Sequence, residues 1–275
     1  MIDEVELIGK GTLIQHGKHN DRIYLMKLNG ENVEQVINTL QQLAHKNNYG
    51  KIFCKVPKKA APLFFAHGYL MESCIPKFYN NKEDVFFLSK FLCADRMLHV
   101  EKEKLSDLSE LLTDQPKNKP NASDYKIRRL SKKDVNQITK LFRQVFESYP
   151  FPIHQEDYIL ETMDDNVQYY GAEMNGQIAA LASSEIDQSG QNAEMTDFAT
   201  HHDHQGKNLS TLLLNVMEKD MKKQGITTLH TIARLNSIPM NKTFIRADYK
   251  YSGTLIKNTN ISGKIESMNI YYKHI

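Results

Sequence analysis

The fold is decided by one stretch of the chain, Thr200-His201-His202-Asp203-His204-Gln205-Gly206-Lys207-Asn208-Leu209-Ser210. Before it, residues 194–200 place Met195 and Ala199 on one side and Phe198 on the other, which is typical of a partly buried strand. After it, apolar residues recur at helical spacing up to a stop at Gly225. The first turn of a helix leaves backbone amides unpaired and partly positive, so this loop can hold a phosphate or diphosphate. An ordinary turn without a ligand is the alternative.

The same loop resembles the cofactor loop of the GNAT superfamily of acyl-CoA N-acyltransferases, which reads Arg or Gln, two residues, Gly, one residue, then Gly or Ala. Gln205 and Gly206-Lys207 fit, whereas Asn208 stands in place of Gly and Ser210 in place of Gly or Ala. Asn tolerates unusual backbone angles best among non-glycine residues, and Ser is small. The resemblance implies acetyl-CoA as co-substrate, held by Phe198, Ala199, Thr200, Gln205, Gly206, Lys207, Asn208, Leu209, Ser210, Asn236 and Asn241.

Composition limits the classes of protein that fit. The 275 residues carry 35 Lys plus Arg against 33 Asp plus Glu, so we expect no nucleic-acid partner. A basic cluster at residues 126–133 is interpreted as a solvated face. Three cysteines without CxxC spacing argue against a disulfide framework or zinc cage, and no apolar stretch is long enough to span a membrane. We therefore expect a cytoplasmic protein without membrane attachment.

A polar segment with two prolines divides the chain into two predicted domains. The predicted boundaries are 1–112 for a smaller α/β domain, 113–124 for a linker and 125–275 for the second domain. In the second domain we predict strands at 125–130, 167–173, 178–186, 193–200, 228–233, 249–257 and 266–272, with helices between them. Ser131 and Asp134 open the first of these helices.

This order resembles the GNAT fold, an α/β (α+β) fold with a mixed, mostly antiparallel central sheet flanked by helices. The first domain shows a weaker form of the same plan, with strands at 23–28 and 52–56 around a helix at 33–44. Two interpretations remain, a degenerate half-GNAT duplicate and an unrelated α/β cap. Because the first domain has no counterpart to Gln205-Gly206-Lys207, we expect the cofactor in the second domain alone.

Blocks from both domains are similar to the bacterial and archaeal β-lysine N-acetyltransferases. They are residues 21–28, 194–200, 240–244, 249–255 and 266–271. The resemblance implies transfer of acetyl from acetyl-CoA to the terminal amine of β-lysine, giving the compatible solute N6-acetyl-β-lysine in osmoadaptation. It also implies a lysine 2,3-aminomutase that supplies β-lysine, and a homodimer is possible. Other small amines, such as lysine, ornithine or a polyamine, and a non-catalytic acyl-CoA sensor are the alternatives.

The chemistry requires a proton acceptor, because a lysine-type amine with a reference pKa of ~10.4 is almost fully protonated at pH 7. Glu194 matches the position of the general base in the histone-modifying branch of the superfamily, with Asp197 and Glu173 as competitors. A backbone amide between Phe198 and Thr200 is expected to stabilise the thioester oxygen. Phe244 occupies the usual acid position, so Tyr249 or Tyr251 is the candidate to protonate the leaving thiolate, unless water suffices.

The acceptor carries a carboxylate and a second ammonium, so its pocket needs donors at one end and carboxylates at the other. The predicted substrate-binding residues are Tyr149, Asn258, Asn260, Glu266 and Asn269. The His201, His202, Asp203 and His204 run does not predict a metal site, because neighbouring ligands in one loop rarely close a coordination sphere.

Overall fold

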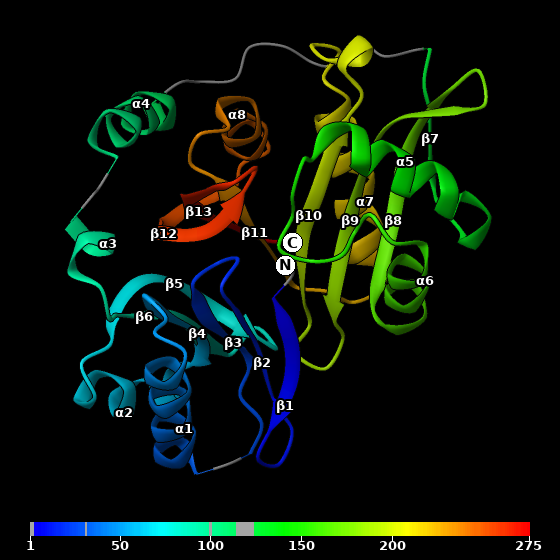
Figure 1. Cartoon of the computed structure of the whole chain (residues 1–275). Helices are drawn as coiled ribbons and strands as arrows, with labels where there is room; N and C mark the ends of the chain where they lie inside the picture. Colours follow the sequence, from blue (N-terminus) through cyan, green and yellow to red (C-terminus); the bar gives the residue numbers. More distant parts are fainter. Residues whose placement is uncertain (1–2, 31, 99–100, 114–123) are drawn as a thin grey trace.

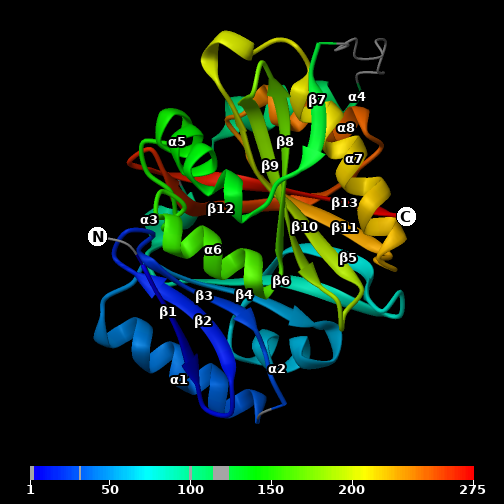
Figure 2. The ribbon, with the colours of Figure 1, turned by 90° about the vertical axis from the view of Figure 1, so that its right-hand side faces the viewer.

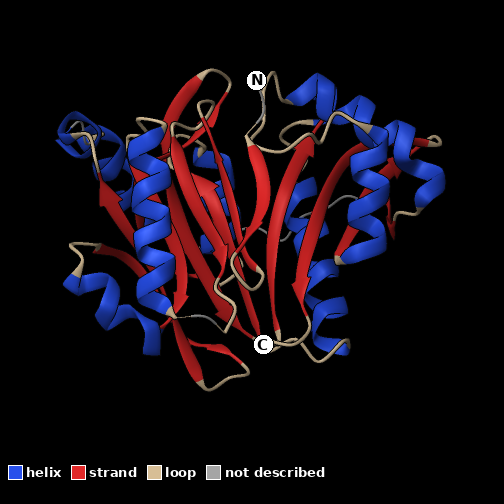
Figure 3. Cartoon of the chain, turned by 60° about the horizontal axis from the view of Figure 1, so that its bottom comes forward, coloured by secondary structure: helices blue, strands red, loops and turns tan. Residues whose placement is uncertain are grey.

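The computed structural model describes residues 3–30, 32–98, 101–113 and 124–275. All strands in this part of the chain join one 13-stranded mixed sheet, in the order β1-β2-β3-β4-β6-β5-β12-β13-β11-β10-β9-β8-β7. The strands run through the middle of the molecule, and helices lie on either side of them (Figures 1 and 3). The predicted mixed, mostly antiparallel central sheet flanked by helices is confirmed.

The first half contains six strands and four α-helices. They are β1 (Glu4–Ile8), β2 (Thr12–Gly17), β3 (Arg22–Lys27), α1 (Val33–Lys46), β4 (Lys51–Pro57), α2 (Ala61–Ala66), β5 (Leu70–Tyr79), β6 (Glu83–Phe91), α3 (Ala94–Leu98) and α4 (Lys102–Thr113), with the short 3-10 helix η1 (Lys58–Ala60) before α2. The strands β1 and β2 were not predicted from the sequence. Predicted linker residues 114–123 lie outside the described residues.

The second half follows the predicted order with small shifts in boundaries. Its elements are β7 (Lys126–Arg129), η2 (Lys132–Asp134), α5 (Val135–Val145), α6 (Glu156–Asp165), β8 (Val167–Met174), β9 (Gln177–Asp187), β10 (Asn192–Thr200), η3 (His202–His204), α7 (Leu209–Lys223), β11 (Thr228–Arg234), α8 (Ile238–Arg246), β12 (Lys250–Ile261) and β13 (Lys264–His274). The predicted capping box of Ser131 and Asp134 is present, and it starts η2 just ahead of α5.

The two halves share one strand plan. In the first half, α1 connects the parallel neighbours β3 and β4. Next in the sheet come β6 and then β5, each antiparallel to the strand before it. In the second half, α7 connects the parallel neighbours β10 and β11. Next in the sheet come β13 and then β12, again in antiparallel pairs. The two halves therefore share this part of their strand order, and the interpretation of the first as a degenerate half-GNAT stays a prediction. The first half has no counterpart to α5 and α6, which in Figure 2 lie beside β8 and β9.

The halves meet edge to edge where β5 pairs with β12, at Ser73 and Gly253. A Cβ atom on Gly253 would lie 2.2 Å from the carbonyl oxygen of Glu72, so only glycine permits this approach. Lys51 and Glu72 strengthen the junction with a buried ion pair of 2.8 Å, and both also bond to the backbone of Ile256.

Four hydrophobic clusters hold the sheet to its helices and its halves to each other. One packs α1 and α2 on the first half, one packs α7 on the second half, and one packs α5 and α6 on the opposite face of the second half. The fourth joins Tyr24, Phe53 and Phe87 of the first half to Leu255 and Ile270 of the second. The inner faces of the two halves therefore meet. No helix in the described part of the chain is long and apolar enough to cross a membrane.

Candidate active site

The predicted anion loop lies directly before α7. Asn208 caps the helix in the left-handed conformation, at φ 57°, which explains why Asn replaces the expected Gly. Gly206 has φ 77°, and the space where its Cβ would lie is open. Within the described residues, the backbone amides from Gly206 to Ser210 donate to no backbone carbonyl outside the helix. The loop therefore presents free donors at the positive end of a four-turn helix.

A pocket of about 690 Å³ begins at this loop and crosses the sheet at β10 and β11. These parallel strands pair only as far as Glu194 and His230, and beyond that point they no longer hydrogen-bond. Of the predicted cofactor residues, the pocket is lined by Phe198, Thr200, Gln205, Gly206, Lys207, Asn208, Leu209 and Ser210. Ala199 is buried beneath it, in contact with the cluster under α5.

The remaining two predicted cofactor residues lie outside this lining. Asn236 is exposed on the turn between β11 and α8. Asn241 is buried, and its amide is fully engaged: it donates to the carbonyls of Arg234 and Ser237 and accepts from Asn269 and Tyr271. Asn241 therefore fixes the end of β11 to α8, so it supports the pocket from behind.

Asp197 lies in the pocket, at the point where β10 bulges away from β9. Its backbone is left-handed, with φ 53°. One carboxylate oxygen accepts from Tyr149 Oη at 2.7 Å and the other from Ser183 Oγ at 2.6 Å. Burial raises the pKa of Asp197, Glu194 adds to this, and the two hydroxyl donors limit it. This carboxylate is thus held in place, and its pKa is raised above the ordinary value of an aspartate.

Glu194 faces the same side of the sheet but does not line the pocket. Its Oε2 lies 3.4 Å from Nε2 of His230, on the adjacent strand. Burial alone would raise the pKa of Glu194, but His230 and Lys55 outweigh it and hold the pKa below its usual value. Glu173, the third predicted base, lies away from the pocket in a 2.7 Å ion pair with Arg128.

The candidate tyrosines differ in position. Tyr249 and Tyr251 do not line the pocket, and Tyr249 is buried against Phe244, with a ring separation of 5.2 Å. Burial raises the pKa of Tyr249 well above its ordinary value, and Glu218 adds to this. The tyrosine that enters the pocket is Tyr149, through its bond to Asp197.

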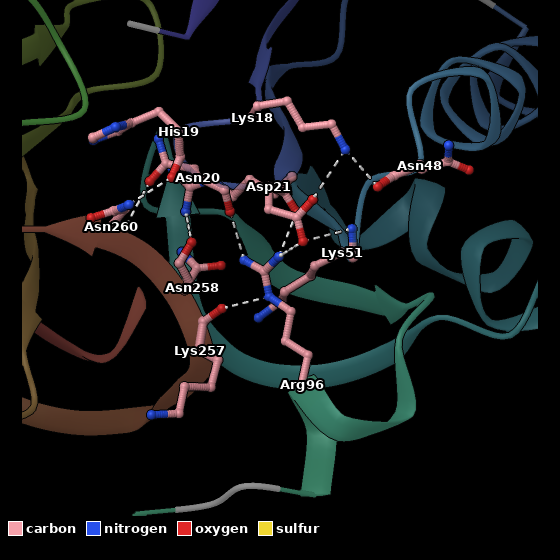
Figure 4. Close-up of polar contacts among 12 residues, drawn as sticks. Lys18, His19, Asn20, Asp21, Asn48, Lys51, Arg96, Lys257, Asn258 and Asn260 are labelled. Atoms are coloured by element: carbon pink, nitrogen blue, oxygen red, sulfur yellow. Dashed lines mark hydrogen bonds and ion pairs between the residues drawn. The ribbon is translucent and has the colours of Figure 1, made fainter. Parts of the chain in front are cut away.

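The predicted substrate residues fall into three groups. Asn258 and Asn260 join the two halves. Asn260 bonds to Asn20 and to the carbonyl of His19 (Figure 4). The carbonyl of Asn258 accepts from Arg22. In the same figure, Arg96 bridges Asn20 and Lys257.

Glu266 forms a bidentate ion pair of 2.8 and 2.9 Å with Arg234, which lines the pocket. Asn269 is buried against Asn241. Of the five predicted substrate residues, only Tyr149 reaches the pocket directly.

Several pocket residues were not predicted. Thr196 and Arg234 line it, and Ser183 holds Asp197 from the neighbouring strand. The alternation of side chains along β10 could have predicted Thr196, because it lies on the same face as Glu194. The contact of Ser183 with Asp197 could not be predicted, because it depends on the bulge in β10. His201, His202 and Asp203 could gather three ligand atoms within 4.8 Å, but two of these residues are exposed neighbours on one turn.

These features define a class of enzyme. A helix N-terminus suited to a diphosphate connects, through parted parallel strands, to the half-buried carboxylate of Asp197 beside the gap. This arrangement serves direct transfer of an acyl group from a coenzyme A thioester to an amine.

The comparisons identify the family. Residues 135–243 match the model of the acetyltransferase (GNAT) family. A β-lysine N(6)-acetyltransferase of Methanococcus maripaludis is 38% identical over 95% of this chain and 96% of its own length. A protein of the same name from Methanosarcina mazei is 30% identical over 86% of this chain and 96% of its own. N-acetyltransferase YodP of Bacillus subtilis is 24% identical over the whole of both chains. The chain belongs to the GNAT family and is an acetyl-CoA-dependent N-acetyltransferase that acts on a small-molecule amine.

Proposed function

We propose that this enzyme moves acetyl from acetyl-CoA to the terminal amine of β-lysine, giving N6-acetyl-β-lysine by direct transfer in a ternary complex. The observation that carries the proposal is the continuous pocket from the free amides before α7 to the carboxylate of Asp197. The acceptor is proposed from two relatives with this activity in their names, which match nearly the whole of their length to this chain.

Asp197 is proposed as the general base. It lies where the thioester must emerge between β10 and β11, while Glu194 is turned toward His230. In the reaction the amine nitrogen attacks the thioester carbon, Asp197 accepts the ammonium proton directly or through water, and the carbon–sulfur bond breaks. The departing thiolate has a reference pKa of ~8.5, so it requires little protonation. This fits the position of Tyr249 outside the pocket.

The diphosphate of coenzyme A is proposed to lie on the amides from Gly206 to Ser210. Lys207 adds a positive charge beside them; its Nζ lies 3.1 Å from the hydroxyl of Tyr125, near the start of the second half. The thioester oxygen is proposed to bind the backbone amide at Phe198, where the strand bulges.

The biological setting belongs to the same proposal. A lysine 2,3-aminomutase would supply the β-lysine, and the product would serve as a compatible solute. We propose the cytoplasm as its location, where reducing conditions keep thiols such as buried Cys54 unpaired. A homodimer is also proposed, and light scattering of the purified protein tests it.

Release of coenzyme A thiol from acetyl-CoA tests the proposed acceptor. The panel contains β-lysine, lysine, ornithine and spermidine, each at several concentrations. We expect the highest kcat/KM with β-lysine. A higher value with lysine or spermidine would reject β-lysine as the acceptor and keep the acetyltransferase.

A further inference from the structure

Two sheet faces meet between the halves, one from β3 and β4 and the other from β9 and β10. On β4, Cys54 packs into the cluster under α1, so the next residue, Lys55, points toward the second half. On β10, Met195 packs into the cluster under α7, so its neighbour Glu194 points toward the first half. Glu185 on β9 pairs with Glu194 across the ladder and shares its direction. Charged side chains from both halves therefore face each other.

These charges are not neutralised by direct contacts. Among the described residues, neither Lys55 Nζ nor the Glu185 carboxylate has a hydrogen bond or an ion pair within 4.0 Å. Burial alone would lower the pKa of Lys55, but Tyr24, Tyr79 and the two glutamates raise it above its usual value. Glu185 is an exposed residue, yet desolvation by the surrounding protein and the charge of Glu194 raise its pKa to about 7. The space between these facing charges, called the recess below, is therefore open to solvent at Glu185.

His230 on β11 lies beside Glu194 on β10. It is only 2% exposed, and its Nδ1 is bonded to the carbonyl oxygen of Ala193 at 3.1 Å. Its Nε2 is buried without a hydrogen bond and lies 3.4 Å from Glu194. His230 thus offsets the charge of Glu194, while Glu185 remains without such a neighbour.

The recess adjoins the catalytic pocket through β9. Ser183, which donates to Asp197, lies two residues before Glu185 on the same face of this strand. Two residues of antiparallel strand span about 7 Å. In β-lysine, five bonds separate the terminal nitrogen from the second one, which gives about 6 Å in an extended chain. An amine at Asp197 therefore leaves the second ammonium within reach of Glu185.

We propose that this recess is the acceptor site, in which Glu185 binds the second ammonium of a diamino acid and Lys55 binds its carboxylate. The assignment rests on the proposed function and gives the first half a role in selecting the acceptor. Arg234 is the competing cation, but two of its guanidinium nitrogens already bind Glu266.

The test uses the full-length variants Lys55→Met and Glu185→Gln with three acceptors. β-Lysine has both groups, 6-aminohexanoate lacks the second amine, and 1,4-diaminobutane keeps both amines without the carboxylate. Lys59→Met is the matched control, because its side chain is 76% exposed and pairs only with Glu83 at the surface. Circular dichroism and the KM for acetyl-CoA verify that each variant is folded and binds its cofactor.

Lys55→Met is expected to raise KM about 10- to 100-fold for β-lysine and 6-aminohexanoate, with the KM for 1,4-diaminobutane unchanged. Glu185→Gln is expected to raise KM for β-lysine and 1,4-diaminobutane and to spare 6-aminohexanoate. Equal changes for all three acceptors, or none, would overturn the assignment. So would a wild-type enzyme that treats all three alike. A wild-type enzyme that prefers lysine while the variants keep this pattern would reject only β-lysine as the acceptor.

Discussion

Replacement of Asp197 by Asn removes the proposed base and keeps the size of the side chain. The hydroxyls of Ser183 and Tyr149 can each donate to or accept from an amide, so both contacts, at 2.6 and 2.7 Å, can persist. At pH 7 only about one acceptor molecule in 2,500 carries a free amine, given its reference pKa of ~10.4. A positioned base contributes about 10²- to 10⁴-fold in rate, or roughly 3 to 5 kcal/mol of activation free energy.

We expect Asp197→Asn to lower kcat/KM for the amine by that factor at pH 7 and to leave the KM for acetyl-CoA unchanged. The assay measures initial rates of thiol release from about pH 6.5 to about pH 9.5. Without the base the rate should follow the concentration of free amine, so it should climb about tenfold per pH unit. The deficit of the variant should therefore shrink as pH rises.

Glu194→Gln is the matched comparison, because Glu194 is also a carboxylate and lies three residues earlier on the same strand. We expect Glu194→Gln to lower kcat/KM for the amine less than Asp197→Asn does. If Glu194→Gln abolished base catalysis while Asp197→Asn stayed near the wild-type rate, the choice of base from its place in the pocket would be refuted.

Three further predictions concern the recess, the domain junction and the cofactor loop. The KM for β-lysine should fall from about pH 6 to about pH 8, because burial raises the pKa of Glu185 to about 7 and only the ionised carboxylate attracts an ammonium. In Glu185→Gln this dependence of KM on pH should be lost, as measured by initial rates at each pH. The charged groups that act on Glu185 are Glu194, Lys55, Asp197 and Asp165. Three tyrosines, Tyr24, Tyr158 and Tyr169, also interact with its charge. Glu72→Gln should lower the free energy of unfolding by about 3 kcal/mol in a urea titration, because it leaves the ammonium of Lys51 buried without its counter-ion, whereas surface Glu83→Gln should change little. Gly206→Val should raise the KM for acetyl-CoA at least about tenfold, because a β-branched residue is strained at φ 77°. Asn208→Gly should preserve this KM, as measured by saturation kinetics.

The second half was predictable from sequence because local signals agree there. Helical spacing after Gly206, the box of Ser131 and Asp134, and the turns at Gly176 and Gly190 each fixed an element boundary within a few residues. β1 was missed because Val5 and Leu7 are exposed on an edge strand, so its alternation carries little burial signal.

The site was only partly predictable, because its key contacts join distant segments. The left-handed backbone of Asp197 and its bond to Ser183 come from a bulge between strands, which residue types do not reveal. Asn258 and Asn260 have the polar chemistry of a binding pocket, yet they tie the halves together. Lys55 lies opposite Glu185 only because the two halves pack against each other, and the spacing of residues in the sequence does not predict this packing.

The seam at β5 and β12 has a consequence for how the chain can be divided. Each of these strands protects the other's unpaired amides and carbonyls, and the seam is sealed by Gly253, Lys51 and Glu72. Cutting the protein between residues 113 and 124 would give two fragments, each with an exposed edge strand that can pair with a strand of another chain. The natural partner of either fragment is the other, so co-expression should restore a soluble pair where single fragments precipitate.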